Sequence, residues 1–308
     1  MSTHPSSKEV YFVDLTGNAD WPNEAVLRRN RPLDTVGNEV ACEFELLKYL
    51  HEHNIPVPRP LLAGDGSVAL QRSFLLMERA RGAVASAASL GTDARDVVLS
   101  LAKQLAKFHR LDPTAAAVRF PAYGDTARKR TLAMIERFYR HSQSGKIEPS
   151  VVMLAAFGWL RAHVDCVDDL SVVVHGDYGL KNVLVEGNSV SAVLDWELSH
   201  IGHPAEDLGY CKDEVSQVMP WEEFLSTYRL HGGPVVTDKA IRYFEIYGCL
   251  FRLATVPAIV GSFADGTLTD YLLGSAGFIE YQEYMDILEK LLLSHSAMDD
   301  LDAFGNFG

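Results

Sequence analysis

The sequence predicts an α+β protein with a small β-rich N-terminal lobe and a larger, mainly helical C-terminal lobe. Its 308 residues exceed the size at which a single core stops growing, roughly 250–300 residues. Strand-like stretches rich in β-branched and aromatic residues gather in the first 80 residues, whereas helical periodicity dominates after residue 92. We therefore predict a division into residues 1–80 and 81–308.

The composition is that of a soluble globular protein, with 47% apolar and 22% charged residues. The opening MSTHPSSKEV lacks the apolar core of a secretory signal, and the longest apolar run, residues 151–160, is too short to span a bilayer. We expect a cytoplasmic protein. The four cysteines are scattered without a CxxC pair, which favours reduced thiols over disulfides or a zinc site.

The net charge of −13 argues against nucleic acid and anionic membranes as partners, because both would repel the chain. An acidic surface that maintains solubility explains this charge better than attraction of a cationic substrate does. The sequence leaves the oligomeric state open, a homodimer included.

The N-terminal lobe begins with two predicted strands, residues 10–15 and 25–28, which the turn-prone GNADWPN separates. A helix is predicted within residues 37–54, with Asn38 as its cap, and the segment PVPRP then breaks it. Its apolar residues recur at three-to-four spacing: Val40, Phe44, Leu47 and Leu50. Two further strands are predicted near residues 67–70 and 73–78.

The C-terminal lobe begins with a helix over residues 93–111, for which Thr92 is the predicted cap. Its apolar stripe comprises Val97, Val98, Leu101, Leu105 and Phe108. Further helices are predicted over residues 126–141, 149–165, 221–231, 238–262 and 270–293. The aromatic stripe of the helix predicted over residues 238–262 favours core packing over a substrate site and comprises Tyr243, Phe244, Tyr247 and Phe251.

One polar stretch interrupts this helical lobe, VVVHGDYGLKNVLVEGNSVSAVLDWE at residues 172–197. Within it, NVLV and SVSAVL flank the turn-forming EGN, which predicts a two-stranded hairpin. Because hairpin strands are antiparallel, Asn182 and Asp195 reach the same open end, within about two residues of register. Asp177 precedes the first strand, so two carboxylates and an amide oxygen converge. Such hard oxygen ligands suit a magnesium ion whose coordination is completed by substrate phosphates.

The spacing of these three residues matches a phosphoryl-transfer site. Asn182 follows Asp177 by five residues, and Asp195 ends the next hairpin strand, as in the catalytic-loop Asp and Asn and the metal-holding Asp of that template. The alternative is a polar loop whose side chains only form hydrogen bonds with its own backbone groups. A loop of that kind does not require the hairpin and the second aspartate, so phosphoryl transfer is favoured.

With these motifs the chain resembles the aminoglycoside phosphotransferase and choline kinase superfamily, which shares its fold with protein kinases. The branch that it most resembles contains the kinase-like domain of acyl-CoA dehydrogenase fusion proteins. The resemblance covers most of the chain. The matching segments are VLRR (26–29), PVPRP (56–60), FLLMER (74–79), HGDYGLKNVLV (175–185) and AVLDWELSHIGHPAEDLGY (192–210).

The resemblance implies a protein-kinase-like bilobal fold and an ATP- and Mg2+-dependent phosphotransferase that acts on a hydroxyl of a small molecule. Asp177 would accept the proton of that hydroxyl, acting chiefly as an orienting base because the transition state is loose. Asn182 and Asp195 would hold magnesium on the ATP phosphates. The same resemblance does not settle the identity of the acceptor or ATP versus GTP.

Cofactor-binding residues follow from the same resemblance. Arg28 would reach the α- and β-phosphates, steadied by Glu43 on the following helix, with Arg29 as an alternative to Arg28. Backbone groups of the segment between the lobes would receive adenine, around Met77, Glu78 and Ala80.

Several histidines are interpreted as structural. His175 is expected to hold the HGD loop by packing and hydrogen bonding rather than to act as an acid or base. The segment HIGHPAED also suggests a transition-metal site, but it contains no third soft ligand and no regular helix, so we disfavour one. The resemblance instead implies that Asp207 is a buried acid that ties this loop to the core. Similar proteins usually carry Asp at the position of His203.

The front of the chain departs from the family pattern. Such kinases begin with a strand and a glycine-rich turn whose backbone covers the ATP phosphates, whereas no glycine precedes Gly17 here. We therefore expect an N-terminal lobe that is shortened at its start. A kinase-like binding module without turnover is the alternative that this departure favours, while the intact Asp177, Asn182 and Asp195 favour the enzyme.

Overall fold

A computed structural model describes residues 8–17, 20–30, 40–65, 72–85, 91–115, 120, 123–144, 149–264, 266, 279 and 281–294. The chain divides into two compact units, each built from separate segments. The first comprises Met1–Pro121, Ser171–Asp207 and Cys211–Val235, and the second comprises Ala122–Leu170, Leu208–Tyr210 and Val236–Gly308. All strands of the described residues belong to the first unit. The boundary near residue 80 stays a prediction.

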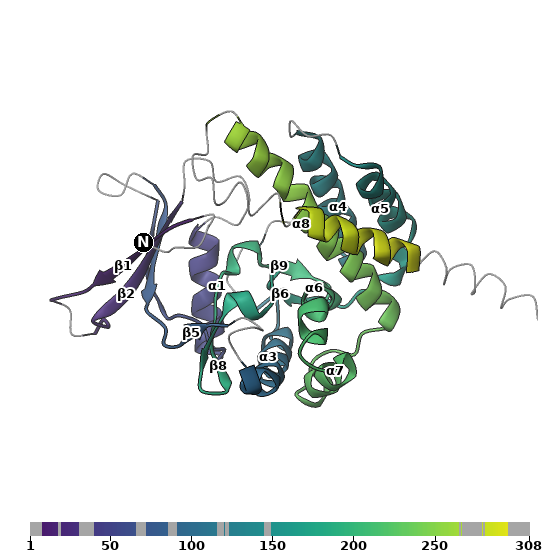
Figure 1. Ribbon diagram of the computed structural model, residues 1–308. Coiled ribbons are helices and arrows are strands. Elements are labelled where there is room, and N and C mark those ends of the chain that lie inside the picture. Colours follow the sequence, from purple (N-terminus) through teal and green to yellow (C-terminus); the bar gives the residue numbers. More distant parts are fainter. Residues whose placement is uncertain are drawn as a thin grey trace, which may run out of the picture. The chain divides into compact units, whose positions relative to one another are not determined.

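The first unit contains a four-stranded antiparallel sheet with the order β1-β2-β4-β3 (Figure 1). Its strands are β1 (Lys8–Asp14), β2 (Glu24–Asn30), β3 (Pro60–Gly64) and β4 (Phe74–Glu78). The predicted antiparallel pair is confirmed, with Val10 opposite Arg28. Helix α1 (Val40–Glu52) contacts β3 and β4 and buries Leu46, Leu47 and Leu50, so its apolar face covers the sheet.

Two details of this region differ from the sequence-based expectation. Strand β3 occupies a segment that we interpreted only as a helix break; its Pro60 is the first residue of the strand, where a missing N–H is tolerated. The strand predicted at 67–70 and the cap Asn38 lie outside the described residues. Helix α3 (Ala94–His109) follows the 3-10 turn η1 (Gly91–Asp93), so Asp93 rather than Thr92 occupies its N-cap position.

Helix α3 is the central helix of the first unit. The predicted apolar stripe is confirmed, because all five of its side chains are fully buried. The helix contacts α7 (Trp221–Leu230) and the hairpin strand β8 (Ser189–Val193). Phe108 presents its ring edge to Tyr178 and Trp196, with centroids 5.4 and 5.1 Å away. This aromatic cluster joins α3 to the polar loop and to the end of the hairpin.

Two small sheets carry the polar stretch. The predicted hairpin is confirmed as β7 (Val183–Glu186) and β8, and β5 (Ala83–Val84) pairs with the outer side of β7. Strand β6 (Val172–Val174) pairs antiparallel with β9 (His200–Gly202), a pairing that the sequence pattern did not predict. The valines of β6 are buried, so the loop after it begins on a rigid base.

The second unit is helical throughout its described residues. Helix α8 (Asp238–Ala264) contacts α4 (Ala127–Ser144) and α5 (Val151–Ala162), and residues 281–294 form a further helix (Figure 1). The Tyr243 hydroxyl donates to the carbonyl of Leu160 at 3.0 Å. Tyr243, Phe244 and Tyr247 are buried, which confirms core packing for these three. Phe251 is half-buried and packs on Phe138, with centroids 4.9 Å apart.

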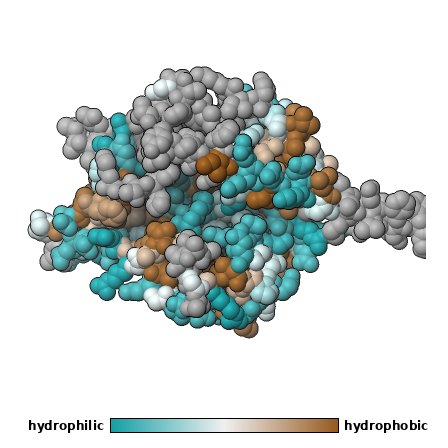
Figure 2. Space-filling model, in the orientation of Figure 1, coloured by the Kyte–Doolittle hydropathy of each residue, from teal (hydrophilic) through white to brown (hydrophobic). Residues whose placement is uncertain are grey.

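The surface is mainly hydrophilic on the face that Figure 2 shows, where apolar residues form small separate patches on the coloured part. None of the helices among the described residues is both long enough and apolar enough to span a membrane. All four cysteines are free thiols, as the sequence predicted.

A glycine pair tests the packing of the second unit. Helix α6 (Ala205–Ser216) approaches α8 at Gly209, where an added Cβ would lie 2.7 Å from the Phe244 carbonyl carbon. Gly209→Ala should lower the free energy of unfolding by about 1–3 kcal/mol, because backbone atoms must move. In the matched control Gly158→Ala on α5, no atom lies within 4 Å of the added Cβ. The higher helix propensity of alanine should therefore raise the free energy of unfolding by roughly 0.5–1 kcal/mol. Urea denaturation measures both changes, and equal effects would contradict the close approach.

Candidate functional site

The loop after β6 and the β7–β8 hairpin bring two of the predicted site residues into contact. The Asn182 amide nitrogen donates to the backbone oxygen and to the Oδ2 of Asp177, both at 2.8 Å. The backbone N–H of Leu194 donates to the Asn182 carbonyl at 2.8 Å, one residue before Asp195. Asn182 and Asp195 therefore lie at the same end of the hairpin, as predicted.

Asp195 has an unusual backbone conformation for a residue with a side chain. Its φ of 63° and ψ of 61° place it in the left-handed region, which non-glycine residues seldom occupy. The next residue, Trp196, is fully buried, and its indole nitrogen donates to the Val193 carbonyl at 3.2 Å. Strained residues of this kind persist where the surrounding structure fixes them, and they cluster at functional sites.

Arg28 of β2 connects three carboxylates of the first unit. Its guanidinium pairs with Glu43 of α1, lies 2.8 Å from Asp195 and lies 3.5 Å from Glu197. Burial works to lower the pKa of Arg28, but the three carboxylates outweigh burial and raise it. Burial raises the pKa of Glu43, and Arg28 opposes that rise. The predicted Arg28–Glu43 pair is confirmed, and it extends to Asp195.

Arg29 is not part of this group, although the sequence left it as an alternative. Successive residues of a strand point to opposite faces of the sheet, so Arg29 lies on the other face from Arg28. Its Nε donates to Glu9 at 2.7 Å, and its guanidinium lies over the Tyr11 ring. Burial works to raise the pKa of Glu9, but the bonds from Arg29 and Tyr11 lower it overall.

Lys181 places a positive charge beside Asp177, with 2.9 Å between Nζ and Oδ1. Its side chain is 57% exposed, so this ion pair contributes little to stability. The sequence did not decide between a role for this lysine and a solvated side chain. The contact puts the lysine next to the predicted base.

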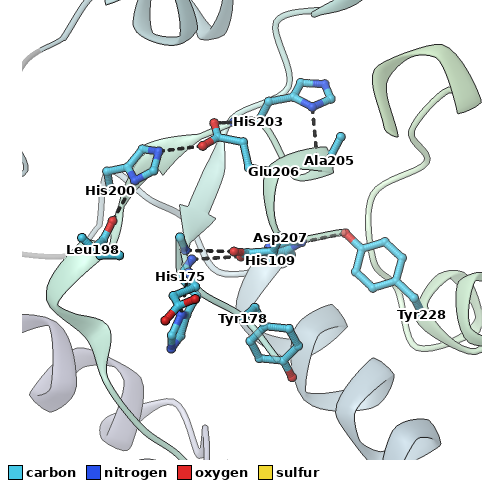
Figure 3. A network of polar contacts seen from close by, with 12 residues as sticks. His109, His175, Tyr178, Leu198, His200, His203, Ala205, Glu206, Asp207 and Tyr228 are labelled. Carbon is cyan, nitrogen blue, oxygen red and sulfur yellow. Dashed lines mark hydrogen bonds and ion pairs between the residues drawn. The ribbon is translucent and has the colours of Figure 1, made fainter. Parts of the chain in front are cut away.

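A buried network around Asp207 holds the loop (Figure 3). The backbone N–H groups of His175 and Gly176 each donate to the Asp207 carboxylate at 2.9 Å, and His109 donates from Nε2 at 3.0 Å. The Tyr228 hydroxyl lies 2.7 Å from the other ring nitrogen of His109. Burial works to raise the pKa of Asp207, but these donors lower it overall. Asp207 therefore ties the loop to the core, as the resemblance implied.

His175 uses both ring nitrogens for backbone contacts. Its Nε2 donates to the Leu194 carbonyl at 2.8 Å, and its Nδ1 accepts from the Asp177 N–H at 3.2 Å. The ring also packs on Trp196, with centroids 4.6 Å apart. These contacts support the interpretation that His175 joins the loop to the hairpin rather than transferring protons.

The HIGHPAED segment forms hydrogen bonds instead of a metal cage (Figure 3). His200 lies 2.9 Å from Glu206 Oε2, and His203 accepts through Nδ1 from the Ala205 N–H at 3.2 Å. His203 thus satisfies one N–H group at the start of α6, a bond that an aspartate at this position could also accept. No group of three candidate ligands occurs among the residues that the structure describes.

The residues predicted to receive adenine lie at the end of β4 and just beyond it. Met77 is buried and pairs with Val26 of β2. The Glu78 N–H already donates to the Arg59 carbonyl at 2.8 Å, so this group is occupied within the sheet. The adenine role of Met77, Glu78 and Ala80 stays a prediction.

The donor set at the hairpin end fits magnesium. Both side-chain hydrogen bonds of Asn182 among the described residues use its amide nitrogen, which leaves its oxygen for a metal. Asp195 keeps 37% of its side chain exposed despite the ion pair with Arg28. Carboxylate and amide oxygens are the ligands that magnesium prefers in proteins.

Comparison of the sequence with known families and proteins gives a consistent match. The model of the phosphotransferase enzyme family matches residues 4–239. Acyl-CoA dehydrogenase family member 11 of Gallus gallus is 30% identical over 310 residues, which cover 92% of this chain. The matched part is 38% of the Gallus gallus protein, so the chain spans well under half of that relative.

Solved phosphotransferase structures share the fold. The macrolide 2′-phosphotransferase of Brachybacterium faecium has a TM-score of 0.61 at 22% identity, covering 91% of this chain and 90% of that one. An aminoglycoside phosphotransferase in ternary complex with AMP-PNP and hygromycin B has a TM-score of 0.62 at 17% identity, with coverages of 94% and 92%. The predicted α+β, protein-kinase-like fold is thereby confirmed.

The pairing of His200 with Glu206 predicts a pH-dependent contribution to stability. Burial works to lower the pKa of His200, but the Glu206 carboxylate raises it overall above the ordinary value of 6.5. A raised folded-state pKa stabilises the protein below the unfolded pKa, and this contribution is lost as pH rises through the folded one. The stability difference between wild type and His200→Gln should therefore shrink as pH rises above 6.5. Denaturant titrations between pH 6 and 9 measure it, and Glu206→Gln should remove the same slope.

Proposed function

The chain belongs to the phosphotransferase enzyme family, and on that premise we propose that it is an ATP- and Mg2+-dependent phosphotransferase that acts on a hydroxyl group of a small molecule. One observation carries the proposal. The hairpin holds Asn182 against Asp177 at one end, and at that same end Asp195 pairs with Arg28. This arrangement combines the base, the metal ligands and a phosphate-binding cation of a phosphoryl-transfer site.

Asp177 orients the acceptor hydroxyl and accepts its proton. Phosphoryl transfer passes through a loose transition state, so positioning and electrostatics matter more than strong activation of the nucleophile. The Asn182 amide fixes the carboxylate through Oδ2, and Lys181 contacts Oδ1. Both contacts restrict the rotation of the carboxylate.

Asn182 and Asp195 would hold magnesium through their oxygens. When bound, the ion would supply positive charge that neutralises the charge developing on the phosphates. Arg28 would contact the α- and β-phosphates, and Glu43 keeps its guanidinium in place through their buried ion pair. The crystallised relative with AMP-PNP supports a nucleotide as the donor.

A kinase-like binding module without turnover is the second candidate. No glycine precedes Gly17 in the sequence, so a glycine-rich turn over the phosphates is not readable there. The presence of all three residues of the base and metal set favours the enzyme. A module freed from catalysis has no need to keep Asp177 and Asn182 in hydrogen-bonded contact.

The acceptor is proposed to be a small hydroxylated metabolite. The relative in Gallus gallus is named an acyl-CoA dehydrogenase family member, and most of its length lies outside the matched part. Two activities joined in one chain commonly act on successive intermediates. Hydroxylated acyl thioesters therefore belong in the acceptor panel, beside aminoglycosides, choline and sugars.

Removing the Asp177 carboxylate should separate binding from catalysis. Asp177→Ala should lower turnover by roughly 10²–10⁴-fold while MgATP still raises the melting temperature, because Asp177 acts on the acceptor rather than on the nucleotide. ADP release over the acceptor panel and thermal shift measure the two effects. Asp125→Ala, an exposed aspartate of the second unit, is the control. A wild type that shows neither ADP release nor a thermal shift would favour the binding module.

Substitution of a proposed metal ligand should change the magnesium dependence of stabilisation by ATP. Asp195→Asn should raise the magnesium concentration needed for half-maximal stabilisation by ATP at least about tenfold, because it removes a charged oxygen ligand. A magnesium titration at fixed ATP measures this shift, and Asp125→Ala again serves as the control. An unchanged midpoint would place the metal elsewhere.

A further inference from the structure

Lys8, the first residue of β1, is a buried cation that the proposed function does not use. Only 3% of the residue is exposed, although lysine is rarely buried without a partner. Its amino group lies 3.5 Å from Glu197 Oε2, within an ion pair.

Lys8 lies on the same face of the sheet as Arg28. Val10 pairs directly with Arg28 across β1 and β2, and residues two apart on one strand share a face. Lys8 is therefore a diagonal neighbour of Arg28, within reach for a long side chain. Glu197 lies 3.5 Å from both cations, so the two positive charges share one carboxylate.

The same group of charges extends to the metal ligand. Arg28 contacts Asp195 at 2.8 Å, and the charge of Lys8 works against the burial that raises the pKa of Glu43. Arg28 thus lies beside Asp195, and Lys8 is joined to Arg28 through Glu197. Both belong to the first unit, which also contains Asp177 and Asn182.

Stability alone is a weak reason to keep a lysine at this position. Charge-assisted hydrogen bonds are usually about 2.7–2.9 Å long, and the Lys8–Glu197 separation of 3.5 Å is longer. Well-packed apolar residues often replace buried ion pairs without loss of stability. Glu197 is one anion that both cations contact, and a phosphate bound beside Asp195 would be a second.

We propose that Lys8 is a second phosphate-binding cation, which acts with Arg28 on the β- and γ-phosphates of ATP. The inference rests on the proposed phosphotransferase function. The residues just before β1, THPSS, contain no glycine, so the backbone N–H groups of a glycine-rich turn are not readable there. The ammonium group of Lys8 would supply positive charge to the phosphates instead.

Charge-specific variants test this role. Lys8→Met keeps an apolar stem but removes the charge, and it should raise the Kd of MgATP about tenfold while the Kd of adenosine stays unchanged. Lys8→Arg should restore most of the MgATP affinity. Arg29→Met is the matched control, because it removes a cation from the other face of the same sheet region. Calorimetric titration of each variant with both ligands gives the ratio of the two Kd values, which does not depend on the folded fraction.

The outcomes separate this inference from the proposed function. If wild type binds MgATP and Lys8→Met shows the same ratio of Kd values, Lys8 does not contact phosphates and only the inference fails. If Lys8→Met weakens the binding of both ligands equally, Lys8 has a purely structural role, and the inference is also overturned. A wild type that binds neither ligand would remove the proposed function and the inference together.

Discussion

The carboxylate of Asp207 is the contact on which the site geometry depends. It lies fully buried, and it accepts the backbone N–H groups of His175 and Gly176 together with the ring of His109. A carboxylate that satisfies two backbone donors fixes the path of a loop more tightly than any side-chain contact on the loop surface could. The ring of His175 then joins the loop to the hairpin end through its hydrogen bond to the Leu194 carbonyl. Asp177 and Asn182 are thereby held in contact.

The second organising feature is electrostatic. Arg28 is surrounded by Glu43, Asp195 and Glu197, and Lys8 shares Glu197 with it. Burying so many charges is favourable only when each has a partner, which explains why β1, β2, α1 and the end of the hairpin converge on one set of ion pairs. The same set places the guanidinium of Arg28 beside Asp195, as the proposed phosphate-binding role requires.

Local sequence patterns predicted the elements that depend on neighbouring residues. The alternation of NVLV and SVSAVL with a turn between them gave the β7–β8 hairpin, and the stripe from Val97 to Phe108 gave α3. Strand β3 was missed because the PVPRP segment that leads into it suggested only a break. Helix α6 was missed because its N-cap position is occupied by Pro204, which offers no side-chain cap. The pairing of β6 with β9 was also missed, since twenty-five residues of loop and hairpin separate the two strands.

The sequence alone determined which chemical groups are available and in what order, since the spacing of Asp177, Asn182 and Asp195 follows from one loop and one hairpin. The burial of Lys8, the choice of Arg28 over Arg29 and the convergence on Glu197 were decided only by tertiary structure. The physical reason is that these contacts join residues separated by up to 189 positions, from Lys8 to Glu197, and no local periodicity records which charges will share a buried site.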